Sequence, residues 1–229
     1  MAESLDYVAT TLEKTVGGDP AKLNAGVQAL LQQIVNDHSA VVFNGNGYSE
    51  EWHKEAEKRG LPNLRNTVAA LPVLLKKEYI DLFEKYKVLT ERETRSRYEI
   101  YTERYVKDIN TEAQCALSIA KTQILPAAYR YQGELAKIAA DLKVIGKNPH
   151  LGTLETLTGM VAKLEEAVGE LDKAANHKGA HDVTAEAKHF NDTVKPAMLA
   201  VREIADELET IVADDIWPLP KYQEMLFIK

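Results

Sequence analysis

The sequence predicts an all-α fold, an elongated helical bundle of long, proline-kinked antiparallel helices joined by extended loops. The first observation is the composition, because only 7% of the 229 residues are aromatic while the strong helix formers Ala, Leu, Glu and Lys are frequent. The second is that apolar residues recur at helical spacing along most of the chain. The third is that glycine, proline or Asn-Gly turn signals separate these stretches.

Two helices and a turn are predicted at the start of the chain. Residues 3–16 carry apolar side chains at helical spacing and stop at Gly17. Asp19 as cap and Pro20 as first residue open a second helix. Its expected buried stripe is Leu23, Val27, Leu30, Leu31 and Ile34.

A turn and two shorter helices are predicted next. The segment 44–47, Asn-Gly-Asn-Gly, is a strong turn signal. Ser49 then caps a charged helix over 50–59, and one further short helix is expected around 79–86.

A long helix is predicted to begin with a capping box formed by Thr90 and Glu93 and to run to about Ile145. About 55 residues at 1.5 Å each span roughly 80 Å. Pro126 lies inside this stretch and is expected to kink or break it. The expected stripe is Tyr98, Tyr101, Tyr105, Ile109, Ala113, Ala116, Ala120 and Ile124.

Two more helices are predicted, over about 154–175 and 183–214, with Pro196 as a second internal kink. The expected stripe of the first of these is Leu157, Met160, Val161, Leu164, Val168 and Leu171. Short loops between long helices favour antiparallel neighbours.

Charge and cysteine content exclude several classes of protein. The net charge of −7 argues against nucleic acid as a partner, because binding phosphates requires a basic surface. No apolar run approaches the ~20 residues that span a membrane, and no signal peptide is visible, so we expect a cytoplasmic protein. Cys115, the single cysteine, is predicted to be a small buried apolar side chain.

Three patterns resemble sites for chemistry, and none of them predicts catalytic, cofactor-binding or metal-binding residues. Residues 41–50 resemble a phosphate cradle, but a third glycine is absent and two glutamates follow. Glu50/His53 and Glu186/His189 have the Glu-x-x-His spacing of di-metal bundles, although chance produces such pairs readily. His177 and His181 flank a glycine in an expected loop, which favours solvated histidines.

The C-terminal tail is the candidate docking segment. Residues 216–228 are too apolar for a free end, so we expect them to dock in a groove of this domain or against a neighbouring subunit. The side chains expected to make this contact are Trp217, Leu219, Leu226, Phe227 and Ile228.

Several stretches resemble the C-terminal region of type III glutamine synthetases, in the same order along the chain. They are VFNGNGYSEEW (42–52), SRYEI (96–100), INTEA (109–113), ILPAA (124–128) and WPLPKY (217–222). By this resemblance, residues 1–16 are the remnant of the last helix of an upstream catalytic domain, and 17–229 form a C-terminal helical domain.

The resemblance implies a non-catalytic domain of a ligase. The parent enzyme would join ammonia to glutamate with ATP and magnesium, in nitrogen assimilation and glutamine biosynthesis, as an oligomer. Its catalytic residues would lie upstream of this segment. The implied partners are the catalytic core and neighbouring subunits. The alternative is a free-standing helical scaffold or protein-binding domain.

Overall fold

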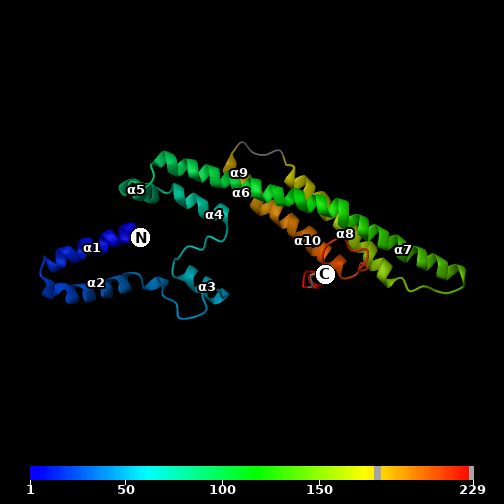
Figure 1. The fold of residues 1–229 in the computed structure, drawn as a ribbon, viewed down its shortest axis with the longest axis horizontal. Coiled ribbons are helices and arrows are strands. Elements are labelled where there is room, and N and C mark those ends of the chain that lie inside the picture. Colours follow the sequence, from blue (N-terminus) through cyan, green and yellow to red (C-terminus); the bar gives the residue numbers. More distant parts are fainter. Residues whose placement is uncertain (178–181, 227–229) are drawn as a thin grey trace. The chain divides into compact units, whose positions relative to one another are not determined.

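Every regular element in residues 1–177 and 182–226, the part of the chain that the computed structural model describes, is helical (Figure 1). The predicted all-α class is therefore confirmed. The chain divides into two compact units, Met1–Tyr98 and Glu99–Lys229. The boundary predicted between residues 16 and 17 rests on the resemblance and stays a prediction.

The first unit consists of short helices. In chain order they are α1 (Ala2–Val16), η1 (Pro20–Lys22), α2 (Leu23–Asp37), η2 (Ser39–Val41), α3 (Glu50–Lys58), α4 (Thr67–Ala70), η3 (Leu71–Leu75) and α5 (Lys77–Lys85). Two predicted caps are confirmed: the Asp19 side chain accepts from the Ala21 amide at 3.0 Å, and Ser49 Oγ accepts from the Trp52 amide at 3.4 Å.

The helices α1 and α2 form a hairpin around Gly17, whose φ of 58° is a left-handed conformation that glycine adopts without strain. The helices approach closely at Gly26, where an added Cβ would lie 3.4 Å from Val16 Cγ2. Of the stripe predicted for α2, Leu30 is buried, but Leu23 and Leu31 are exposed. The prediction was wrong for these two because α1 covers only one side of α2.

The second unit contains the longest helices. The boundary between the units falls inside the first of them, α6 (Glu91–Ile119). The elements that follow are η4 (Ala120–Ile124), α7 (Leu125–Val144), α8 (Gly152–Ala175), α9 (Val183–His189), η5 (Phe190–Val194), α10 (Lys195–Glu209) and α11 (Tyr222–Met225). The capping box predicted at the start of α6 is confirmed, because Glu93 Oε2 accepts from the Thr90 amide at 2.8 Å and Thr90 Oγ1 accepts from the Glu93 amide at 3.3 Å.

The core of the second unit lies along α8, which packs mainly against α7 and α10. All six side chains of its predicted stripe are buried, and Leu157, Leu164 and Leu171 are fully enclosed. Each such side chain contributes about 1.5–3 kcal/mol. The α10 side of this contact includes Val201 and Leu208.

Pro126 and Pro196 each follow a π-helical segment at the same distance along the chain. A five-residue π-helical segment, η4 or η5, ends two residues before Pro126 or Pro196. A π-turn loosens the i→i−4 ladder at the place where proline has no N–H to donate. The long helices are thus interrupted as α-helices where the sequence predicts, and the accompanying bend stays a prediction.

Side chains also tie η4 to α8. Lys121 Nζ lies 2.5 Å from Asp172 Oδ2, and this hydrogen bond holds the pKa of the Asp172 carboxyl below its usual value. Both side chains are partly exposed, so the pair contributes little beside the apolar stripe.

Replacing Leu164 by alanine is expected to destabilise the second unit by about 2–5 kcal/mol, because this fully enclosed side chain leaves a cavity against α10 and α7. Leu199→Ala is the matched control, since Leu199 on α10 is 55% exposed and its loss is worth within about 0.5 kcal/mol. Urea unfolding followed by circular dichroism measures both. Equal midpoints for the two variants would contradict the assignment of the core to α8.

Candidate docking surfaces

The polar groups of the turn at 44–49, which resembles a phosphate cradle, form hydrogen bonds within the turn itself. Asn46 Oδ1 accepts from the Tyr48 amide at 3.0 Å, and Ser49 Oγ donates to the Asn46 carbonyl at 2.8 Å. The first turn of α3 then presents Glu50 and Glu51, whose charges repel a phosphate. The arrangement is that of a turn and a capped helix.

Aromatic and cationic side chains hold this turn in place. Phe43 stacks on Trp52 at 4.6 Å between ring centroids. Arg59 donates from Nη1 to the carbonyls of Ala40 and Val42 at 3.2 and 2.7 Å, and its Nε bonds to Glu55. The turn is thus rigidly supported and carries Tyr48 almost fully exposed.

The two Glu-x-x-His pairs belong to different units and have local partners. His53 Nδ1 lies 3.3 Å from Glu50 Oε1. A ring nitrogen of His189 lies 2.9 Å from the carbonyl of Ala174. No group of three ligating side chains occurs in residues 1–177 and 182–226. The ring of His177 lies 4.7 Å from the ring of His189 between centroids and is tilted by 40° against it, while His181 lies outside the described residues.

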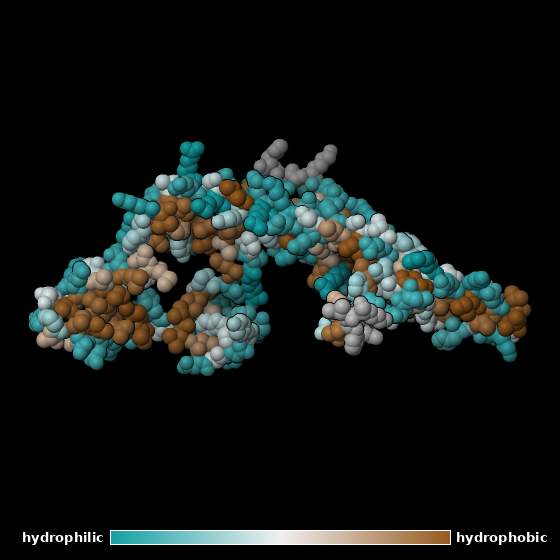
Figure 2. All heavy atoms as spheres, viewed as in Figure 1, coloured by the Kyte–Doolittle hydropathy of each residue, from teal (hydrophilic) through white to brown (hydrophobic). Residues whose placement is uncertain are grey.

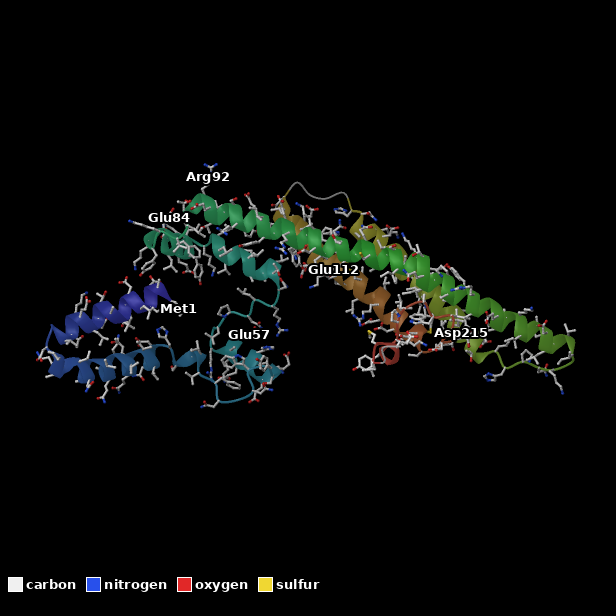
Figure 3. All side chains as sticks on the ribbon, in the orientation of Figure 1. Met1, Glu57, Glu84, Arg92, Glu112 and Asp215 are labelled. Carbon is white, nitrogen blue, oxygen red and sulfur yellow. The ribbon has the colours of Figure 1, made fainter. Side chains whose placement is uncertain are left out.

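Charged side chains on the exposed face of α6 pair with each other. Arg95 lies 2.7 Å from Glu91, and Lys107 lies 3.4 Å from Glu103. Arg92 points away from the helix (Figure 3). These exposed pairs are worth only tenths of a kcal/mol, which is typical of a solvated helix face.

Cys115 is exposed, so the prediction that it is buried was wrong. The buried side of α6 here passes through Ala113 and Leu117. At 100° per residue, Cys115 faces away from that side. Its neighbours in sequence are small and polar, and composition alone could not distinguish the two sides.

The tail divides into a buried part and an exposed part. Trp217 is 8% exposed, and its amide donates to the Ala213 carbonyl at 3.0 Å. Its indole Nε1 is buried and has no hydrogen-bond partner in the part of the chain that the structure describes. Leu219 is half-buried, whereas Leu226 in the segment after α11 is 60% exposed. Phe227 and Ile228 lie outside the described residues.

A second apolar surface, which the sequence did not predict, lies on the α1–α2 hairpin. Within residues 2–16 no side chain is buried, and in α2 only Gly26 and Leu30 are. Figure 2 shows a continuous apolar area over these two helices. The large exposed apolar side chains here are Leu5, Tyr7, Leu23, Leu31 and Val35. The four-residue spacing of Leu23, Val27, Leu31 and Val35 was the sequence signal for this surface.

Charged groups border this hairpin. Lys85 of α5 lies 3.8 Å from Glu3 and 3.7 Å from Asp6, and the Tyr86 hydroxyl donates to Asp6 at 2.8 Å. A side-chain hydrogen bond with Tyr86, and then the nearby carboxylates, raise the pKa of Lys85. A groove of about 820 Å³ runs along α1 here, between the end of α2 and Lys85.

The chain is similar to part of several longer proteins. The model of the glutamine synthetase C-terminal domain family matches residues 26–143. A type-3 glutamine synthetase from Dictyostelium discoideum is 34% identical over 100% of this chain and 32% of its own length. Glutamine synthetases of Butyrivibrio fibrisolvens and Bacteroides fragilis are 32% and 28% identical, over 96% and 100% of this chain. The chain spans about a third of the length of these relatives.

Removing the tail in two steps should separate its buried and exposed parts. Deletion of residues 216–229 removes Trp217 and is expected to cost about 3–5 kcal/mol, whereas deletion of 222–229 leaves this residue in place and should cost much less. Melting temperature and mass by light scattering measure both. If the longer deletion left both quantities unchanged, the tail would be a passive end.

Proposed function

The chain belongs to the glutamine synthetase C-terminal domain family, and on that premise we propose that it is the non-catalytic helical domain of a type III glutamine synthetase. In this proposal the parent enzyme ligates ammonia to glutamate with ATP and magnesium in the cytoplasm. The domain packs on the catalytic core and supports assembly of the oligomer.

Two observations support this proposal most directly: the greater length of the relatives and the apolar surfaces that the chain leaves exposed. The relatives are about three times as long as the chain, so the proposed parent has room for a complete catalytic core outside it. The chain itself presents two apolar surfaces, on the hairpin and on the tail. Exposed apolar patches of this kind are characteristic of protein contacts.

The residues at hand do not fit the cofactors of the parent reaction. The glycine turn before α3 is followed by two glutamates, and its amides serve the turn itself. The carboxylates of α6 pair with neighbouring Lys and Arg. We therefore assign the ATP and magnesium sites to the part of the parent polypeptide outside this chain.

The tail is proposed to contact a neighbouring subunit. Trp217 anchors the segment within the second unit, and the turn that follows is held by Lys221 Nζ, 2.5 Å from Asp214 Oδ1. Tyr222, Met225 and Leu226 are then exposed beyond this anchor. An anchored segment loses less conformational entropy on binding than a free one. The same surfaces would serve a free-standing scaffold, the alternative function, and the gene sequence upstream of Ala2 discriminates between the two.

The chain by itself is expected to form no glutamine from glutamate, ammonia and ATP. The complete parent polypeptide, purified in the same way, is the positive control, and heat-treated chain is the blank. ATP-dependent formation of glutamine by the chain alone, above that blank, would overturn the assignment of catalysis to the missing part.

Removing residues 17–229 from the parent is expected to reduce its assembled mass, because the subunit contacts made by the domain are lost. Specific interfaces bury about 1,200–2,000 Å² in total, so the loss of one removes a large part of the contact that holds a subunit in the assembly. Light scattering at several concentrations measures the mass. A truncated parent of unchanged subunit number would contradict the role in assembly.

A further inference from the structure

The α1–α2 hairpin has an apolar face that nothing in its own unit covers. Leu31 is 56% exposed and Val35 62% exposed, although both lie inside a well-formed helix of 15 residues. With Leu23 and Val27 they form a stripe at four-residue spacing, in which neighbouring members are adjacent on one broad face of α2. We call Leu23, Val27, Leu31 and Val35 the α2 stripe.

The stripe is continuous with apolar surface of α1. Leu12 and Val16 of α1 contact α2 around Gly26, where an added Cβ would lie 3.8 and 3.4 Å from their side chains. Leu5, further along α1, is exposed. Figure 2 shows the resulting apolar area spanning both helices. The hairpin therefore offers a two-helix apolar face rather than scattered single residues.

Such a face is costly to leave in water. Two helices of 15 residues are marginal without tertiary packing, and most helix stability in proteins comes from burying one apolar face. By contrast, α8 of the second unit buries its whole stripe. The hairpin thus has the sequence of a packed element, and its own unit, residues 1–98, does not cover this face.

The polar groups around the hairpin restrict what can cover it. Residues 1–37 contain five acidic side chains and two basic ones. An amphipathic helix that binds a membrane surface carries lysine and arginine on its polar face, so this hairpin is a poor membrane ligand. Glu13 and Asp37 have no basic partner among the ion pairs of residues 1–177 and 182–226. An apolar surface with a basic rim would complement both the apolar face and these carboxylates.

We propose that the part of the parent polypeptide preceding Ala2 covers the α2 stripe and the adjoining face of α1. This inference rests on the proposed function. In the relatives, about two thirds of the polypeptide lies outside the matched region, and the matching family domain is C-terminal. In this proposal the covering part is joined to α1 in the same polypeptide. A covalent junction a few residues away gives that part a high effective concentration at the hairpin, of the order of millimolar for a short connection.

A second copy of this chain is the competing occupant. It would have to bring together two faces of the same negative charge, which is unfavourable. Pairing of copies depends on concentration, whereas covering within one polypeptide does not. This difference separates the two by experiment.

Amide hydrogen exchange of residues 2–37 tests the proposal, compared between this chain alone and the complete parent. We expect exchange in the parent to be slower by at least about tenfold, to the same extent at low and high protein concentration. Protection that appears in the chain alone as its concentration rises would identify a second copy as the occupant. Equal exchange in chain and parent would show that the face stays in water. Either result overturns the proposal.

Two substitutions in the parent sharpen the test. Leu31→Glu places a charge in the α2 stripe and should abolish most of the extra protection. Ala29→Glu adds the same charge to the same helix at an exposed position about 200° around the helix from Leu31 and should leave protection unchanged. If both variants kept full protection, the stripe would not be the contact.

Glutamine synthesis by the same parent preparation keeps this inference apart from the proposed function. A parent that synthesises glutamine but leaves residues 2–37 unprotected would refute only the covering of the hairpin. A parent that protects the hairpin but makes no glutamine would refute only the assigned reaction.

Discussion

The second unit depends on one interaction, the burial of the apolar stripe of α8 between α7 and α10. Leu157, Leu164 and Leu171 are fully enclosed there, and each contributes about 1.5–3 kcal/mol. Polar contacts such as that between Gln132 and Thr158, at 2.8 Å, add register rather than strength. The positions of the flanking helices follow from the need to cover α8 on both sides.

The contrast between α8 and α2 shows how much a sequence can predict. Both helices carry an equally regular apolar stripe, and periodicity identified both as helices with the correct ends to within a few residues. For α8 the stripe is buried, as predicted, but in α2 Leu31 remains exposed. Periodicity reports which face needs a partner. It does not report whether the partner lies within the same stretch of chain.

Errors at single positions have a similar origin. Thr94 and Thr102 are buried on α6, because each has a short side chain whose polar atom is bonded; the Thr94 hydroxyl donates to the Thr90 carbonyl at 3.0 Å. A hydropathy pattern passes over such residues. Tyr101 was placed in the stripe and is exposed, one position away from buried Thr102. The tail was recognised from composition, but only the structure distinguishes buried Trp217 from exposed Leu226.

The paired π-segments have a consequence for the phase of the long helices. A π-turn holds about one residue more than an α-turn, so η4 acts as a single-residue insertion in an otherwise α-helical stretch. A plain α-helix formed by the same five residues, 120–124, would rotate everything after it by about 100°. Ala128 would then leave the buried side. The same holds for η5, so each π-segment keeps the apolar residues before and after it on the buried side.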